Sequence, residues 1–62
     1  MTVYKLKRKF HSYKKGTQFY LIAESEFIGV KEFVLRTKDL TDRISINETE
    51  LDKHFTFIRN VY

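Results

Sequence analysis

The segment from Arg43 to Ile58 constrains the fold most, because it reads as a strand, a capped helical turn and a second strand. Residues 43–46 alternate polar and apolar side chains, which is the period of a half-buried strand. Asn47 lies three residues before Glu50. This is the spacing of a capping box, in which each of the two side chains accepts a hydrogen bond from the backbone of the other. The sequence therefore predicts a helical turn that begins at this cap.

Apolar spacing supports the same boundary. Ile46 before the cap and Leu51 after it have the spacing of a hydrophobic staple. Leu51 and Phe55 lie four residues apart and share one helical face. Residues 55–58 then return to β-forming types. We expect a helical turn near Thr49 to His54 and a last strand from Phe55 to about Val61.

The length of the chain sets the energetic problem. Sixty-two residues make one domain, residues 1–62, with one core. A chain this short buries only about 60% of its unfolded surface, and without Cys it has no disulfide. The six Phe and four Tyr are the main source of packing, and a homodimer is a second source because association shields more surface. The lack of Cys fits a reducing cytoplasm, which is the expected location.

The N-terminal segment predicts a basic strand at Thr2 to Phe10. Tyr4, Leu6 and Phe10 fall on one parity, whereas lysines dominate the other. Residues 11–16 are expected to form a loop that turns at Gly16. The expected strand therefore has one buried face and one lysine face, and the lysines also protect an edge strand from unwanted pairing.

The middle of the chain predicts two more strands. Thr17 to Ser25 is the strongest strand, and because it is apolar on both parities it should lie centrally. Glu32 to Thr37 is the next strand, and residues 38–42 form a turn. The segment from Phe27 to Val30 has two interpretations. It is either a bulged continuation of a strand around Gly29 or the apex of a hairpin.

Five short strands with most apolar residues on one parity indicate an all-β fold, a small closed or partly closed barrel. The chain resembles the Src-homology-3-like barrels, whose one-turn helix between the fourth and fifth strands is matched by Asn47 to His54 and the strand that follows. The resemblance covers residues 16–58 and is architectural. It implies a module that binds nucleic acids or proteins, but the lack of Trp and Pro argues against binding proline-rich peptides. An OB-like barrel is the alternative fold.

No arrangement of residues predicts catalysis. Asp52 and His54 lie two apart on a helical turn and point in different directions. The two His are far apart and lack the spacing of metal ligands, and two Gly cannot make a glycine-rich phosphate loop. We therefore expect no enzyme, no cofactor and no metal. No apolar run is long enough to span a membrane.

The charge is uneven along the chain. Residues 1–16 contain six of the twelve basic residues and none of the eight acidic ones, so this segment carries +6 and the remainder carries −2. A basic end on a mildly acidic body predicts an acidic partner. Lysines at alternate positions of a strand would recur about every 6.6 Å, near the spacing of phosphates on an extended nucleic-acid strand. Their alternative role is solubility and edge protection.

Nucleic-acid binding through phosphate contacts is the leading functional hypothesis. The candidate cations are Lys5, Lys7, Arg8, Lys9, Lys14 and Lys15, with Tyr13 and Tyr20 as stacking surfaces for unpaired bases. The alternative is a protein-interaction module that binds an acidic protein surface, and an inhibitor encoded by a phage or mobile element belongs to this class. Phe27 and Ile28 mark its interface if they form a loop, and belong to the core if they form a strand.

Overall fold

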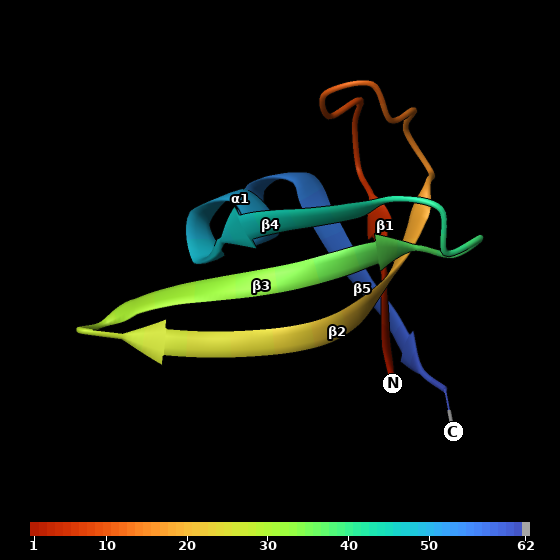
Figure 1. Ribbon diagram of the computed structural model, residues 1–62. Helices are drawn as coiled ribbons and strands as arrows, with labels where there is room; N and C mark the ends of the chain where they lie inside the picture. Colours follow the sequence, from red (N-terminus) through yellow and green to blue (C-terminus); the bar gives the residue numbers. More distant parts are fainter. Residues whose placement is uncertain (62) are drawn as a thin grey trace.

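The structure is a computed structural model that describes residues 1–61 (Figure 1). It contains five strands and one short helix: β1 Thr2–Leu6, β2 Gln18–Phe27, β3 Val30–Thr37, β4 Arg43–Asn47, α1 Glu48–His54 and β5 Phe55–Asn60. The strands form one antiparallel sheet in the order β4-β3-β2-β1-β5. A mostly β fold with a short helix before the last strand is therefore confirmed. Among the described residues, no helix is long and apolar enough to cross a membrane.

The expected barrel does not close. β4 and β5 are the two edges of the sheet, and no strand pairing joins them within residues 1–61. α1 follows β4 without a loop and leads directly into β5, so the helix stands where a closing strand pair would be. β2 curves strongly and changes direction between its two ends (Figure 1). The register of β2 against β3 shifts between Leu21 and Ala23, and such a bulge bends a strand.

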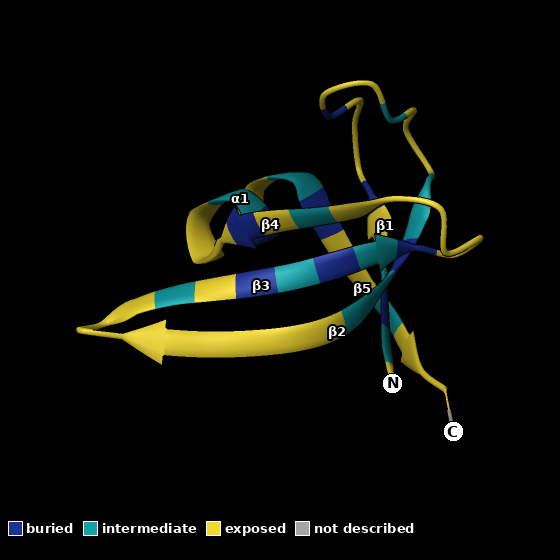
Figure 2. Cartoon of the chain, in the orientation of Figure 1, coloured by how far each residue is buried: buried dark blue, intermediate teal, exposed yellow. Residues whose placement is uncertain are grey.

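The core lies on one side of the curved sheet, and buried residues alternate with half-buried ones along the second half of β3 (Figure 2). Phe19 is fully buried, and its ring meets Phe55 edge-on with the ring centroids 5.5 Å apart. The cluster consists of Leu6, Phe10, Phe19, Phe33, Leu35, Ile46, Leu51 and Phe55. It draws residues from all five strands, from α1 and from the loop after β1, so one cluster ties the whole chain together.

The capping box forms as the sequence predicts. The backbone N–H of Glu50 donates to Asn47 Oδ1 at 2.8 Å, and the backbone N–H of Asn47 donates to Glu50 Oε1 at 3.1 Å. Two of the free backbone donors near the helix start are thereby satisfied. Leu51 and Phe55 are buried. The helix begins at Glu48, one residue earlier than expected.

The first strand is shorter than predicted, and its expected lysine face is wrong. β1 ends at Leu6, where the backbone N–H of Gly16 donates to Leu6 O at 2.9 Å and closes the loop that follows the strand. β1 also lies between β2 and β5 rather than at an edge. Residues 7–17 therefore form a loop, and edge protection cannot explain their lysines.

The segment from Phe27 to Val30 is the apex of a hairpin. Ile28 and Gly29 have φ values of 52° and 76°, and β2 and β3 pair up to Phe27 and Val30. Phe27 is 76% exposed and Ile28 is 85% exposed. The interpretation that placed these two residues in the core is wrong, because the strands extend past the core and carry the turn into solvent. β2 and β3 are accordingly longer than the sequence indicated.

Candidate nucleic-acid interface

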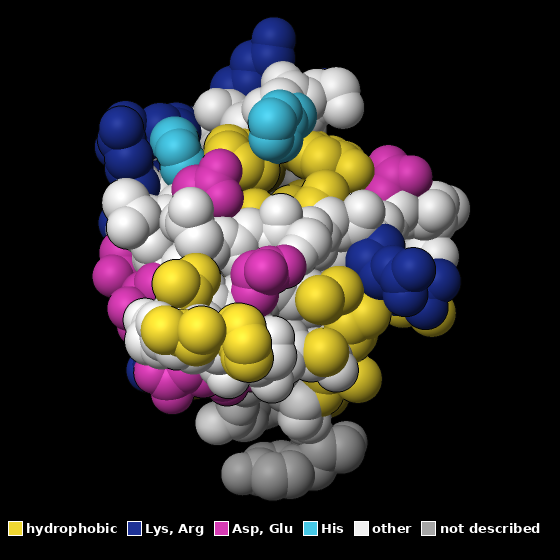
Figure 3. Space-filling view, turned by 60° about the vertical axis from the view of Figure 1, so that its left-hand side comes forward, with side chains coloured by type: hydrophobic (Ala, Val, Ile, Leu, Met, Phe, Trp, Pro, Cys, Tyr) yellow, Lys and Arg dark blue, Asp and Glu magenta, His cyan; other side chains and the backbone are white. Residues whose placement is uncertain are grey.

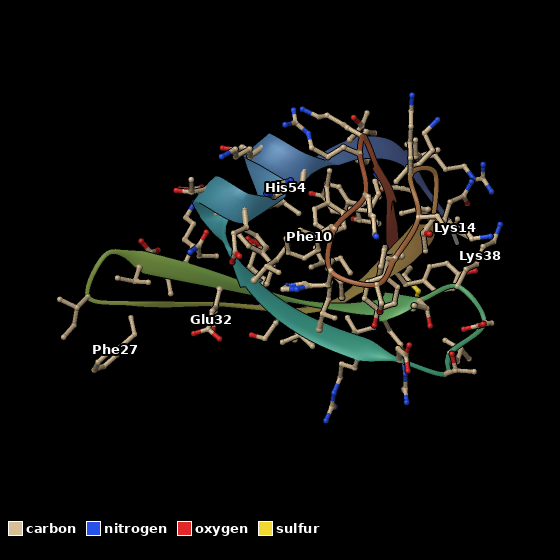
Figure 4. All side chains as sticks on the ribbon, turned by 90° about the horizontal axis from the view of Figure 1, so that it is seen from above. Phe10, Lys14, Phe27, Glu32, Lys38 and His54 are labelled. Atoms are coloured by element: carbon tan, nitrogen blue, oxygen red, sulfur yellow. The ribbon has the colours of Figure 1, made fainter. Side chains whose placement is uncertain are left out.

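The loop between β1 and β2, residues 7–17, is called the basic loop below. Phe10 and Tyr13 bridge it with two backbone hydrogen bonds of 3.1 and 2.9 Å. Phe10 is buried, and its ring centroid lies 4.8 Å from that of His54 and 5.7 Å from that of Phe55. Figure 4 shows Phe10 turned toward the interior beside His54. One aromatic side chain therefore anchors the loop to the core and leaves its charged residues outside.

The cations of the basic loop have no carboxylate partner among residues 1–61. Within this part of the chain the one ion pair joins Lys31 Nζ and Glu48 Oε2 at 3.7 Å, far from the loop in sequence. Lys7 Nζ donates to the backbone carbonyl of Asp52 at 3.0 Å. The exposed cations of the loop are Lys7, Arg8, Lys9, Lys14 and Lys15. Unpaired cations gathered in one loop create a positive potential that attracts anions.

The space-filling view shows Lys and Arg side chains beside the two histidines at the upper end of the molecule (Figure 3). Five of the six predicted cations belong to the basic loop, and Lys5 alone lies on β1. The predicted row of lysines at alternate strand positions is therefore wrong. The chain turns after Leu6, so five of these cations lie on a loop and not on an extended strand.

Tyr13 packs inward. Its ring meets Phe19 edge-on at 5.3 Å, and its hydroxyl donates to Asp42 Oδ2 at 3.2 Å. Burial, followed by the hydrogen bond to Asp42, raises the pKa of Tyr13 above its ordinary value. A ring held in this way supports the core, so Tyr13 is a poor surface for base stacking.

Tyr20 lies on the other side of the sheet, which we call the outer face. It is the partner of Val3 on β1 and of Arg36 on β3. Arg36 is in turn the partner of Arg43 on β4, and Val3 is the partner of Arg59 on β5. Directly opposed residues in antiparallel strands project to the same face. One row across all five strands therefore carries three arginines and a tyrosine.

Sequence reasoning missed these three arginines. Arg36, Arg43 and Arg59 are spread over 24 positions of the segment whose net charge is −2, and only the strand register brings them together. Alternation within each strand could place each arginine on a polar face. It could not show which residues of neighbouring strands lie opposite one another. The outer face is therefore a second cationic surface that the linear charge pattern does not reveal.

Lys38 lies where the two cationic surfaces meet. Its Nζ donates to Gln18 Oε1 at 3.4 Å, and Gln18 is the partner of Lys5 across β1 and β2. Lys38 and Tyr13 both line a hollow of about 560 Å³ between the end of the basic loop and the turn after β3. Figure 4 shows Lys38 and Lys14 at the same end of the molecule.

The opposite end carries the exposed hairpin. Figure 4 shows Phe27 at the tip of the β2–β3 hairpin, away from Lys14 and Lys38. Phe27, Ile28 and Val30 are all well exposed. The apolar and the cationic surfaces are therefore separated by the length of the sheet.

Residues 1–61 contain no group of three or more His, Cys, Asp or Glu side chains arranged to hold a metal ion. Comparisons with protein-family models, with curated proteins and with solved structures find no match for this chain.

Proposed function

We propose that this chain is a small, non-enzymatic Src-homology-3-like module that binds nucleic acid through phosphate contacts from the basic loop. The observation that carries the proposal is the group of five exposed cations without a carboxylate partner in residues 1–61. The short helix between the fourth and fifth strands supports the fold assignment. The basic loop is anchored by buried Phe10, so its charges are held on one side of the molecule.

The expected mode of binding is electrostatic. Lysine side chains are flexible point charges, which suit phosphates and carry no base readout by themselves. Each phosphate that is neutralised releases condensed counterions, so affinity falls as salt rises. The basic loop should therefore bind many sequences with similar affinity.

The proposal is tested by fluorescence titration of labelled single- and double-stranded DNA and RNA at about 50 and about 200 mM salt. Lys14→Gln and Lys15→Gln should each weaken binding and reduce the slope of log K against log salt by about 0.7 to 0.9. Lys31→Gln is the matched control, since it removes the same charge at the hairpin, where it pairs with Glu48. Equal effects of all three variants would contradict the assignment to the basic loop.

A second candidate function is protein interaction through the hairpin tip. Ile28 combines 85% exposure with a φ of 52°, and a β-branched residue is strained in that region. An exposed apolar residue in a strained turn does not stabilise the fold. Contact with a partner therefore explains the presence of Ile28 at this position better than folding does. The proposed partner of the hairpin tip is a second copy of the chain. For the basic loop, the alternative to nucleic acid is an acidic protein surface.

Sedimentation at high salt tests the second candidate, because salt screens charge contacts and leaves apolar ones. A dimer that dissociates on Phe27→Ser would support it. A monomer at all concentrations would exclude self-association through the tip.

A further inference from the structure

Beyond the basic loop, we propose that the outer face of the sheet is a second nucleic-acid contact that selects single strands. Arg36 and Arg43 hold one phosphate between them, and Tyr20 stacks on the unpaired base beside it. This inference rests on the proposed function and adds the class of nucleic acid and the residues that choose it.

The first observation is the pairing of like charges. Arg36 and Arg43 are direct partners on β3 and β4. Side chains opposed in this way have Cβ atoms about 4.5–5.5 Å apart, and like charges in that position repel each other. No carboxylate lies within ion-pair distance of either arginine in the described part of the chain. An anion between the two guanidinium groups would turn this repulsion into attraction.

The second observation is a donor without an acceptor. Arg36 Nε is buried and makes no hydrogen bond within residues 1–61. Buried donors are satisfied in the great majority of cases, so an unpaired one indicates a missing acceptor. The planar guanidinium matches phosphate oxygens with two parallel hydrogen bonds. Because Nε is covered, a phosphate that approaches from the outer face bonds the terminal guanidinium nitrogens of Arg36 first, and the side chain has to turn before Nε can donate as well.

The third observation concerns Tyr20, which is the partner of Arg36 in the sheet. On its other side lies Val3, which has 0% exposure although it faces away from the core cluster. A small side chain on an outer face is covered only if its longer neighbours lie over it. Tyr20, the direct neighbour of Val3 in the sheet, stays partly exposed. Stacking on its ring requires a base that is free of a duplex.

The charges continue from this row toward the basic loop. Lys5 lies two residues beyond Val3 on β1, opposite Gln18, and Lys38 Nζ reaches Gln18 Oε1. Lys38 also lines the hollow beside Tyr13 and residues 16–18, at the end of the basic loop. A flexible single strand can bend with the curved sheet from one surface to the other, and on the way it passes the hollow that Lys38 lines together with Asp39 and Asp42.

The test compares a labelled single strand of about 12 nucleotides with the duplex of the same sequence, by fluorescence polarisation at low salt. Arg43→Gln should weaken single-strand binding about tenfold and lower the salt slope by about 0.7. Tyr20→Leu should weaken single-strand binding roughly 5- to 100-fold and leave duplex binding unchanged. Tyr20→Phe keeps the ring and should bind like the wild type. Lys31→Gln is the charge control.

Arg43 is exposed, so its variant should remain folded, and circular dichroism checks this for every variant. If Arg43→Gln and Tyr20→Leu bind like the wild type while Lys14→Gln binds more weakly, the outer-face inference is overturned and the proposed function stands. If the wild type binds neither single strand nor duplex at low salt, the proposed function fails and the inference fails with it. If Tyr20→Leu does not fold, the Arg43→Gln variant decides alone. Wild-type affinity of Arg43→Gln for the single strand would show that the two arginines do not bind a phosphate between them.

Discussion

Arg36 on β3 and Arg43 on β4 are direct partners in the sheet, with Tyr20 on the far side of Arg36. The three residues come from three strands and form one row of the outer face. A sheet built for stability alone would place opposite charges at such a pair. The pair therefore costs the free protein stability unless an anion lies between the two guanidinium groups.

Replacing one arginine of the pair should stabilise the free protein. Arg43→Glu places a carboxylate opposite Arg36 and should raise the free energy of unfolding by about 0.2–1 kcal/mol. Urea denaturation followed by circular dichroism measures the change. Arg59→Glu is the control, because its partner is uncharged Val3, and it should give no comparable gain. If Arg43→Glu were less stable than the wild type, the repulsion between Arg36 and Arg43 would be offset by other contacts in the native state.

The capping box should contribute measurably to stability. Asn47→Ala removes the acceptor of the Glu50 N–H and should cost about 1 kcal/mol. In a domain of this size that loss lowers the melting temperature by roughly 4–8 °C. Asn47→Ser retains an acceptor and should melt close to the wild type. Equal melting temperatures for Asn47→Ala and the wild type would show that the cap is not needed.

A residue that accepts positive φ at position 28 should stabilise the hairpin turn. Ile28→Asn gives an Asn-Gly turn with Gly29 and should stabilise the protein by about 1 kcal/mol. Thermal unfolding measures this, with Val30→Asn on the neighbouring strand as the control. If the hairpin tip binds a second copy, the same variant should be monomeric. A destabilised Ile28→Asn protein would refute strain at Ile28.

The turn after β3 should make stability depend on pH in the acid range. The hydroxyl of Thr37 donates to Asp39 Oδ1 at 2.7 Å, and Thr41 donates to the same oxygen through its hydroxyl and its backbone N–H. These hydrogen bonds, that of Thr37 first, lower the pKa of Asp39 below its ordinary value of 3.8. Because the folded pKa is the lower one, the contribution is present above 3.8 and is lost as the pH falls through the folded pKa.

Asp39→Asn isolates this effect, because the amide does not titrate. The melting temperature of the wild type should fall more steeply with acidification below pH 3.8 than that of the variant. Parallel curves for the two proteins would show that the hydrogen bonds to Asp39 do not couple to folding.

The local signals in the sequence predicted the C-terminal half well. The cap at Asn47, the strand that precedes it and the burial of Leu51 and Phe55 all depend on neighbours within a few residues. The extent of β1 was not predictable in this way. β1 ends where the backbone N–H of Gly16 bonds Leu6 O across a loop, and no periodicity in the sequence records that bond.

The candidate site shows the same division. The charge excess of residues 1–16 identified the cations, but the burial of Phe10 against His54 decided that they gather in a loop. The hairpin was hidden because Ile28 occupies a turn position where Asn or Gly is usual. The outer arginines were hidden because a face shared by several strands depends on register, which one sequence does not display.

The proposed function depends on electrostatic binding of nucleic-acid phosphates by the cations of the basic loop. The most direct measurement is the affinity for a labelled single-stranded oligonucleotide across a salt series. Five loop cations acting on phosphates predict binding at about 50 mM salt that weakens with a slope of log K against log salt of about −3.5 or steeper. No binding at that salt, or binding indifferent to salt, would contradict it.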